Sequence, residues 1–423
     1  MPHFTCPACK VGIDLQHPDT RLYGCPKCGA LLDFSSGFPN KVDKLDKARI
    51  SQLIPLGTVG VLRGLEYTVI AYTKRIVDHS SAYWAEYVLM NNADRSIRFL
   101  SASDGHWLLV ENIPMEDFPE VTTSSFETKT EVKYEAKTFE LFSRFSGHYT
   151  CIIGEIPWEL NYKQSTRCLE FINPPQMISF EMDQRQGRHE INAFRGIYIY
   201  PKEVKKAFLK DKALPPRIGI APAQPFLRGL RPNQFGIAAF VFCLVALFSF
   251  LYNNSHRQNK LIMQDSFYIN DSTVNKPLLS PSFRFDDKVT NIEVQVNTDL
   301  TNNWCALDLT LVNEVTGEER TIPLETAYYR GVEDGESWSE GDYKQTAFVC
   351  SVTPGQYHFV ATTATEKAGP TVRADVTVFW DVPTVWNEVI LCLLFGGAAL
   401  VFMKWQQIRE DERWENSDIT YRK

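Results

Sequence analysis

Two stretches of the chain are apolar around their whole circumference. Residues 235–252, FGIAAFVFCLVALFSFLY, and residues 389–403, VILCLLFGGAALVFM, contain no charged residue. The alternative for each is a helix buried in a soluble core, but such a helix needs only one apolar face. Uniform runs of this length are typical of membrane spans. The pattern predicts two transmembrane helices, at 235–252 and, with the flanking VPTVW, at 385–404.

Outside these stretches the pattern is mainly that of β-strands. Before the first span, runs of β-branched and aromatic residues such as TVGVLRGLEYTVIAYTKRIV predict a β-rich domain over residues 41–214. Its first ten residues, KVDKLDKARI, predict a charged helical connector, and PKEVKKAFLKD near its end predicts a short helix. Asp104 and the glycine after it predict a hairpin turn. Frequent prolines then predict an extended tether at 215–234.

Between the two spans, residues 253–384 again alternate apolar and polar positions. The alternation is clearest at Ile292, Val294 and Val296 and in the following run WCALDLTLVN. Six such runs separated by turn residues predict an antiparallel β-sandwich with one solvated face per sheet. The predicted fold class is therefore mainly β, with two transmembrane helices and this sandwich on the far side of the membrane.

Charge separates the segment between the spans from the rest of the chain. The 423 residues have a formal net charge of −7, which argues against general nucleic-acid binding. Residues 253–384 hold 10 Lys and Arg against 19 Asp and Glu, whereas the preceding residues hold 29 against 26. The sandwich is thus acidic and faces surroundings different from those of the N-terminal part.

Basic residues near the span ends predict the orientation, because Lys and Arg are retained on the cytoplasmic side. The flanks outside the two spans carry eight basic residues and the segment between them carries four near its ends. The eight are Arg217, Arg228, Arg231, Lys404, Arg409, Arg413, Arg422 and Lys423, and the four are Arg257, Lys260, Lys367 and Arg373. Both termini, including the tail 405–423, are therefore predicted to be cytoplasmic, and the sandwich extracytoplasmic.

Four cysteines near the N-terminus form two CxxC pairs. Cys6, Cys9, Cys25 and Cys28 have the spacing of a four-cysteine zinc ribbon, predicted over residues 1–40. Four thiolates complete a tetrahedral shell and leave no position for water, so the predicted Zn²⁺ is structural. Few basic residues surround the module, which favours docking to protein over binding to nucleic acid.

Two cysteines of the predicted sandwich stand apart from the others. Cys305 and Cys350 lie in strand-like runs in the segment assigned to an oxidising compartment. They are predicted to form a disulfide, and the alternative is two buried free thiols.

Catalytic signals are weak along the whole chain. The sequence contains no GxSxG, HExxH, GxxxxGK or GxGxxG motif. Glu86 and Glu155 lie near tryptophans in strand-like runs, where a buried carboxylate with a raised pKa can act as an acid. Such a carboxylate is more often structural and partnered.

An acidic stretch of the predicted sandwich surrounds Trp338. The sequence YYRGVEDGESWSEGDYK offers oxygen ligands beside an aromatic ring, a combination that suits Ca²⁺ or a sugar as an outer ligand. The spacing does not match an EF-hand, and a simple acidic loop is the favoured alternative.

Several motifs together resemble one bacterial family. LGTVGVLRGLEYTVIAY, WAEYVLMNNADRSIRFLSASDGHW, FSRFSG, GEIPWEL, FINPPQMISFE and EVKKAF occur in order over about residues 50–209. In this order they resemble domain of unknown function family 4178. The resemblance implies a cytoplasmic β-rich domain, in some members joined to a zinc ribbon and membrane spans, in the context of polyamine synthesis or envelope stress. It implies no activity.

The sequence leads to one functional hypothesis and two alternatives. The first is a non-catalytic scaffold or sensor of the bacterial inner membrane that links the extracytoplasmic domain to cytoplasmic protein partners. The second is an enzyme or enzyme subunit that uses Glu86 or Glu155. The third is an accessory subunit of a transporter or channel, although charge-free spans do not form a polar pathway by themselves.

Overall fold

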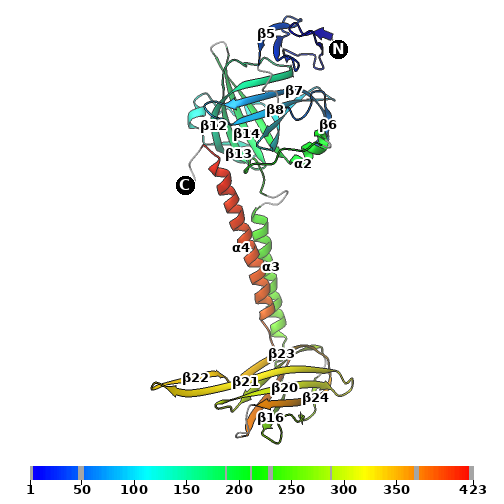
Figure 1. The fold of residues 1–423 in the computed structure, drawn as a ribbon, viewed down its shortest axis with the longest axis vertical. Helices are drawn as coiled ribbons and strands as arrows, with labels where there is room; N and C mark the ends of the chain where they lie inside the picture. Colours follow the sequence, from blue (N-terminus) through cyan, green and yellow to red (C-terminus); the bar gives the residue numbers. More distant parts are fainter. Residues whose placement is uncertain are drawn as a thin grey trace. The chain divides into compact units, whose positions relative to one another are not determined.

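The computed structural model describes residues 3–45, 52–185, 188–209, 212–226, 232–285, 288–365 and 371–418 (Figure 1). The fold is mainly β, as predicted. The chain divides into two compact units, one formed by Met1–Pro232 with Val401–Lys423 and the other by Asn233–Leu400. Some basic residues used to predict the orientation lie outside the described residues, namely Arg228, Arg231, Lys367, Arg422 and Lys423.

The N-terminal cysteine module (residues 3–45) contains five short strands. Strands β1 (His3–Thr5) and β2 (Gly12–Asp14) pair with each other. Strands β3 (Leu22–Gly24), β4 (Ala30–Asp33) and β5 (Asn40–Lys44) form an antiparallel extension of the main sheet. The predicted helix over residues 41–50 is wrong at its start, where residues 41–44 belong to strand β5. The free backbone N–H and C=O groups at the edge of β4 pair with this strand. Residues 46–50 of the predicted helix lie outside the described part of the chain.

Eight antiparallel strands of the first unit close into a barrel. Each pairs with the next in the order β12, β13, β14, β15, β10, β9, β8, β7, and β7 pairs again with β12. Their bounds are β7 (Leu65–Val77), β8 (Tyr83–Asn91), β9 (Ile97–Ser103), β10 (His106–Ile113), β12 (Lys137–Ile156), β13 (Thr166–Asn173), β14 (Gln176–Arg185) and β15 (Arg188–Ile199). The predicted turn at Asp104 joins β9 to β10, with positive φ at Asp104 and Gly105.

The 20-residue strand β12 makes the closure. Its first half pairs with β13 and its second half, from His148 to Gly154, pairs with β7. Gly154 has φ +85°, and a Cβ there would lie 2.2 Å from the carbonyl oxygen of Ile70. Only glycine allows the two strands to approach this closely. Closure therefore depends on one small residue at the end of the ladder.

Short elements cover the outward face of the barrel. The helical segment α2 (Pro201–Val204), the predicted helix, continues as a π-helical turn η3 (Lys205–Leu209) and packs on Tyr72, Tyr87 and Trp107. A second apolar cluster lies on the outward faces of β13 and β14. The remaining elements around the barrel are β6 (Val59–Leu62), η2 (Met115–Asp117), α1 (Ser125–Thr128) and β11 (Glu131–Tyr134).

Within the described residues, two helices are long and apolar enough to cross a membrane. They are α3 (Pro232–Ser255) and α4 (Trp386–Glu415), with mean hydropathies of 2.4 and 1.8 in their most apolar windows. They lie side by side, and the rings of Phe242 and Phe395 are 4.0 Å apart between centroids (Figure 1). Most of their surface is exposed, unlike that of a soluble core helix. Helix α4 extends beyond the predicted end of the span at residue 404.

The second unit also contains the predicted antiparallel sandwich. One sheet has the strand order β16-β25-β19-β23 and the other β17-β24-β20-β21-β22, with β18 beside β24. The two sheets enclose one apolar core, in which Ile292, Val294 and Val296 are at most 2% exposed. Strand bounds are β16 (Lys260–Ile269), β17 (Leu278–Leu279), β18 (Phe283–Phe285), β19 (Thr290–Thr298), β20 (Asn303–Asn313), β21 (Glu319–Glu333), β22 (Glu336–Asp342), β23 (Lys344–Val352), β24 (Gly355–Thr365) and β25 (Val372–Trp380).

The structure does not support the predicted disulfide, because both thiols are free and face different ways. Cys305 on β20 is 1% exposed in the core, whereas Cys350 on β23 is exposed. The ladder between β19 and β23 slips where Val352 and Val349 pair with Thr290 and Ile292. Ala347 and Val349 of β23 pack against the core, so Cys350 faces outward by regular alternation, and the bulge returns Val352 to the core.

The acidic stretch around Trp338 forms a hairpin rather than a loop. Strand β22 pairs with the end of β21, and Asp334 and Gly335 make the turn with positive φ. Every residue of β22 is exposed, and Trp338 is 45% exposed. Its ring lies against Gly331 on the opposite strand. The hairpin residues are therefore available to solvent, as an outer ligand site would require.

Candidate functional site

The four cysteines of the N-terminal module come together at the ends of two turns. Their sulfur atoms all lie within 4.8 Å of one another, with Cys6 and Cys28 at 3.9 Å and Cys9 and Cys25 at 3.7 Å. Zinc–sulfur bonds of about 2.3 Å in a tetrahedron place sulfurs about 3.8 Å apart. The four thiols could therefore hold one metal ion, and the donor set suits a metal that prefers sulfur.

The thiols of Cys9 and Cys25 in this site differ in their pKa values. A hydrogen bond from the backbone of Val11 lowers the pKa of Cys9 to about 7. Burial raises the pKa of Cys25 to about 12. A metal ion would supply the positive charge that a buried thiolate such as Cys25 lacks.

Glu155 attaches the cysteine module to the barrel. Its carboxylate is 4% exposed and accepts hydrogen bonds from the backbone of Gln16 at 2.9 Å and of His17 at 2.8 Å. The hydroxyl of Thr20 donates a further bond at 3.0 Å, and Arg95 donates to the carbonyl of Gln16. A carboxylate that accepts this many hydrogen bonds holds the cysteine module against the barrel. Few of its oxygen lone pairs remain free for acid–base chemistry.

We expect Glu155→Gln to loosen the cysteine module from the barrel. The amide nitrogen would face backbone N–H donors, which leaves one or two of them without an acceptor and costs about 1–3 kcal/mol. Limited proteolysis should cleave residues 3–45 faster than in the wild type. The exposed Glu131→Gln on β11 serves as the control, and equal cleavage of both variants would contradict the docking role.

Glu86 belongs to a charged cluster on the inward face of the barrel. Arg75 on β7 donates both hydrogen bonds of one nitrogen to Glu181 on β14 at 3.0 Å and lies 3.3 Å from Glu86 on β8. Strand β14 is three strands away from β7 around the barrel, so this contact crosses the concave side. The guanidinium also stacks 4.4 Å from the ring of Tyr149.

The C-terminal end of α4 is attached to the first unit by Arg413. This side chain is 1% exposed and donates to the carbonyls of Pro222 at 2.5 Å and Gln224 at 2.7 Å, and to that of Ala221 at 3.3 Å. Its fourth partner is Glu410, one turn earlier. These contacts define the Arg413 joint, in which a helix end is tied to the proline-rich tether.

The residues after Arg413 continue the attachment onto the barrel. The ring of Trp414 packs 5.5 Å from that of Phe142, and the hydroxyl of Ser417 donates to the carbonyl of Phe142. Ser143 on β12 donates to the carboxylate of Asp418 at 3.0 Å. Any displacement of this end of α4 is therefore opposed directly by the barrel.

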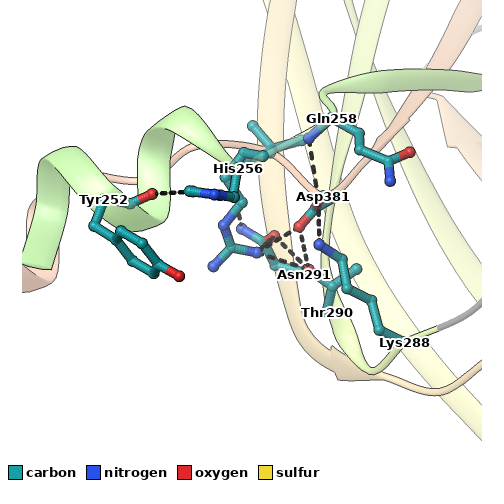
Figure 2. A network of polar contacts seen from close by, with 9 residues as sticks. Tyr252, His256, Gln258, Lys288, Thr290, Asn291 and Asp381 are labelled. Carbon is teal, nitrogen blue, oxygen red and sulfur yellow. Dashed lines mark hydrogen bonds and ion pairs between the residues drawn. The ribbon is translucent and has the colours of Figure 1, made fainter.

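A second joint connects the other ends of the two long helices with the sandwich (Figure 2). Asp381, fully buried between β25 and α4, pairs with Arg257 just after α3 and with Lys288, each at 2.6 Å. The hydroxyl of Thr290 and the backbone of Gln258 donate to the same carboxylate at 2.8 and 3.1 Å. Both helix ends are thus fixed to the sandwich by this Asp381 joint.

The balance of forces at Asp381 keeps its carboxylate ionised. Burial by itself would raise its pKa, but hydrogen bonds from Lys288, Arg257 and Thr290 lower the pKa of Asp381 well below its usual range. The carboxylate of Asp381 is therefore ionised at and above the ordinary carboxyl pKa, as its ion pairs with Arg257 and Lys288 require.

Comparison with known proteins identifies the barrel region. Residues 55–201 match the family described as Domain of unknown function (DUF4178). These residues are a DUF4178 domain. The family predicted from the sequence is confirmed for this part of the chain. The match covers the barrel strands with Arg75, Glu86 and Glu155, and it ends before the tether and the two long helices.

Other comparisons add nothing to the DUF4178 assignment. No curated protein matches the chain. Among solved structures, the insecticidal delta-endotoxin Cry8Ea1 of Bacillus thuringiensis is 8% identical, with 77% of this chain and 55% of that chain covered and a TM-score of 0.16. The infectious bursal disease virus Gx strain is 9% identical, with 88% and 70% covered and a TM-score of 0.16. TM-scores this low carry no argument about fold or function.

The structure brings together residues that the sequence did not single out. Arg75 and Glu181 flank Glu86 in the DUF4178 domain, and Arg413 and Asp381 form the two joints. Arg75 follows Thr73 and Lys74 near the end of β7, where a charged residue is ordinary, so the sequence gives no signal for it. The sequence does not indicate the buried roles of Asp381, Arg257 and Arg413, because charged residues beside a span end are usually solvated.

Proposed function

We propose that the chain is a two-pass protein of the bacterial inner membrane that acts as a non-catalytic scaffold or sensor. In this proposal the sandwich is extracytoplasmic, and the DUF4178 domain and cysteine module face a cytoplasmic protein assembly. The Arg413 joint is the observation that carries the proposal. A helix of membrane-spanning length whose end is buried in a folded domain can pass a displacement to that domain.

The Asp381 joint supports the same proposal from the other helix ends. Arg257, Lys288 and Asp381 fix the ends of α3 and α4 to the sandwich, and α4 is one continuous helix from Trp386 to Glu415. A rigid helix with buried polar contacts near each end transmits a movement of one end to the other, which a flexible tether does not. The orientation, with both termini cytoplasmic, rests on the distribution of Lys and Arg along the sequence.

The carboxylates considered for catalysis favour a non-catalytic role. Glu86 is paired with Arg75, and Glu155 is saturated by donors of the cysteine module. A deletion strain complemented with Glu86→Gln should keep function, whereas Arg413→Met should lose it at an equal level of protein in the membrane. The opposite outcome would favour the enzyme hypothesis.

We further propose that Cys6, Cys9, Cys25 and Cys28 bind one structural Zn²⁺. Sulfur separations of 3.7 and 3.9 Å fit tetrahedral coordination, and four thiolates leave no open position for substrate. The ion would fix the two turns of the cysteine module and, through Gln16 and His17, the surface that contacts Glu155.

Metal analysis of the full-length protein is expected to give about one zinc per chain. Replacing Cys25 and Cys28 together with Ser should remove it and expose residues 3–45 to protease, because the module has only a small apolar core of its own. Cys151→Ser, on the outward face of the barrel, is the control and should keep its zinc. A folded, metal-free module would contradict the assignment.

A further inference from the structure

Strand β11 is paired on one side only. It forms a hairpin with β12, and the two residues of the turn, Glu135 and Ala136, both have positive φ. No strand that the structure describes pairs with the other side of β11. An edge of this kind offers free backbone N–H and C=O groups to a strand of another molecule.

The hairpin geometry determines which backbone groups of β11 are free. Just before the strand, the carbonyl of Thr130 accepts from the amide of Leu141 at 2.8 Å. Because the direction of these groups alternates with each residue, the N–H and C=O groups of Glu131 and Lys133 point away from β12. They make no hydrogen bond with a described residue. The free edge therefore carries two donors and two acceptors in a row.

A groove of about 330 Å³ runs beside this edge. It is lined by the consecutive residues 128–133 and by Glu120. Successive side chains of a strand point to opposite faces, so lining by consecutive residues indicates that the groove follows the backbone edge. Its volume is at the lower end of the range of binding sites, about 300–1,000 Å³. The edge is thus open and has space beside it for another strand.

The side chains of β11 divide between the core and the solvent. Val132 is 1% exposed and belongs to the apolar cluster on β13 and β14. Glu131 and Lys133 are exposed, and neither makes an ion pair with a described residue. One acid and one base therefore flank a buried residue, and both are available to another molecule.

These two charges are complementary to a second copy of the same strand. If two β11 strands pair antiparallel about a two-fold axis at Val132, Glu131 of each copy lies opposite Lys133 of the other. These are also the residues whose backbone groups are free. A slip by two residues places Lys133 opposite Lys129 in one direction and opposite Lys133 in the other. Like charges directly opposite are destabilising, so the charges favour a single register.

We propose that two copies of this chain associate through β11, so that the barrel sheets of both copies join in one antiparallel ladder. Glu131 and Lys133 of the two copies form the ion pairs that specify the register, and their backbone groups form the hydrogen bonds. The contact is short, and its formation is favoured when both copies are held in one membrane, which raises their effective concentration. The dimer goes beyond the proposed function and involves the DUF4178 domain alone.

The test measures association in isolated membranes, by energy transfer between full-length copies with donor and acceptor fluorophores at the N-terminus. Wild-type copies should show transfer that an excess of unlabelled wild type removes. Lys133→Glu should weaken association at least about tenfold, because two-fold symmetry converts both ion pairs into like-charge contacts. Glu131→Lys should have the same effect. The exposed Lys163→Glu is the control and should associate as the wild type does.

A mixture of the two variants distinguishes loss of charge pairing from misfolding. Lys133→Glu copies present two acids and Glu131→Lys copies two bases, so the mixture should recover energy transfer that neither variant shows alone. In wild-type membranes, a carbodiimide, which joins a carboxylate directly to an amine, should link Glu131 of one copy to Lys133 of the other. No transfer between wild-type copies, equal transfer with Lys133→Glu, or no recovery in the mixture would overturn the proposal. A monomeric wild type that complements a deletion strain would refute the dimer and leave the proposed function standing.

Discussion

Arg413→Met is expected to release the C-terminal end of α4 from the DUF4178 domain. Methionine keeps much of the side-chain volume but donates no hydrogen bond, so the carbonyls of Ala221, Pro222 and Gln224 lose their shared donor. Unsatisfied buried acceptors and the lost charged hydrogen bonds together cost about 3 kcal/mol or more. Hydrogen exchange should accelerate in peptides covering residues 405–418 and 218–226, in protein held in micelles.

Arg409→Met, one turn earlier on the same helix, is the matched control. Arg409 is partly exposed and makes none of the carbonyl contacts of Arg413. The Arg409→Met substitution removes the same charge and introduces the same methionine side chain. Because it leaves the Arg413 contacts in place, hydrogen exchange in both peptides should be unchanged. Equal acceleration in the two variants would mean that charge near the membrane, and not the joint, holds this end of α4.

Asp381→Asn is expected to destabilise the sandwich and its connection to α3 and α4. The change leaves Arg257 and Lys288 without their buried counter-ion, and breaking a buried ion pair from one side costs about 3–5 kcal/mol. Lys288 also lies 5.5 Å from the centre of the Trp380 ring. Denaturant unfolding in micelles should therefore show an earlier transition for the sandwich.

Acid provides a second test of the same joint. Because the pKa of Asp381 is lowered in the folded state, its contribution to stability is fully present above the ordinary carboxyl pKa of 3.8 and is lost only as pH falls through the lowered value. The difference between wild type and Asp381→Asn should therefore persist from about pH 7 to about pH 4. The exposed Asp308→Asn on β20 should unfold as the wild type does, and a difference that vanishes by about pH 5 would contradict the account.

Elements that depend on local pattern were predictable from the sequence. The two apolar helices follow from uniform composition, and the six predicted sandwich strands correspond to β19, β20, β21, β23, β24 and β25. The helix starting at Pro201 and the turn at Asp104 follow from residues with restricted backbone conformations. Each of these signals is contained within a short window of sequence.

Features that depend on distant pairing were not predictable. Closure of the barrel joins His148–Gly154 to β7, some seventy residues earlier, and only that closure brings Arg75 to Glu181. The Asp381 joint likewise joins positions 257, 288 and 381. Single side chains at such positions look like ordinary surface charges until the chain has folded.

The position of Cys350 shows how far sequence alternation specifies the face of a strand residue. Ala347 and Val349 of β23 pack against the core, so alternation along the regular part of the strand places Cys350 on the outward face, away from the buried Cys305. The bulge beside Ser351, which has φ +58°, then returns Val352 to the core. Sequence alternation specifies the face of a residue only where the ladder is regular.

This exposed thiol allows the most direct test of the proposed membrane arrangement. Spheroplasts are treated with a membrane-impermeant maleimide, and labelled peptides are identified by mass spectrometry. The account predicts that Cys350 is labelled without prior reduction and that Cys350→Ser abolishes this label. Thr123→Cys, an exposed position of the DUF4178 domain placed in the Cys350→Ser background, should react only after the membrane is opened. Labelling of Thr123→Cys in intact spheroplasts, or of Cys350 only after lysis, would contradict the two-pass arrangement with both termini in the cytoplasm.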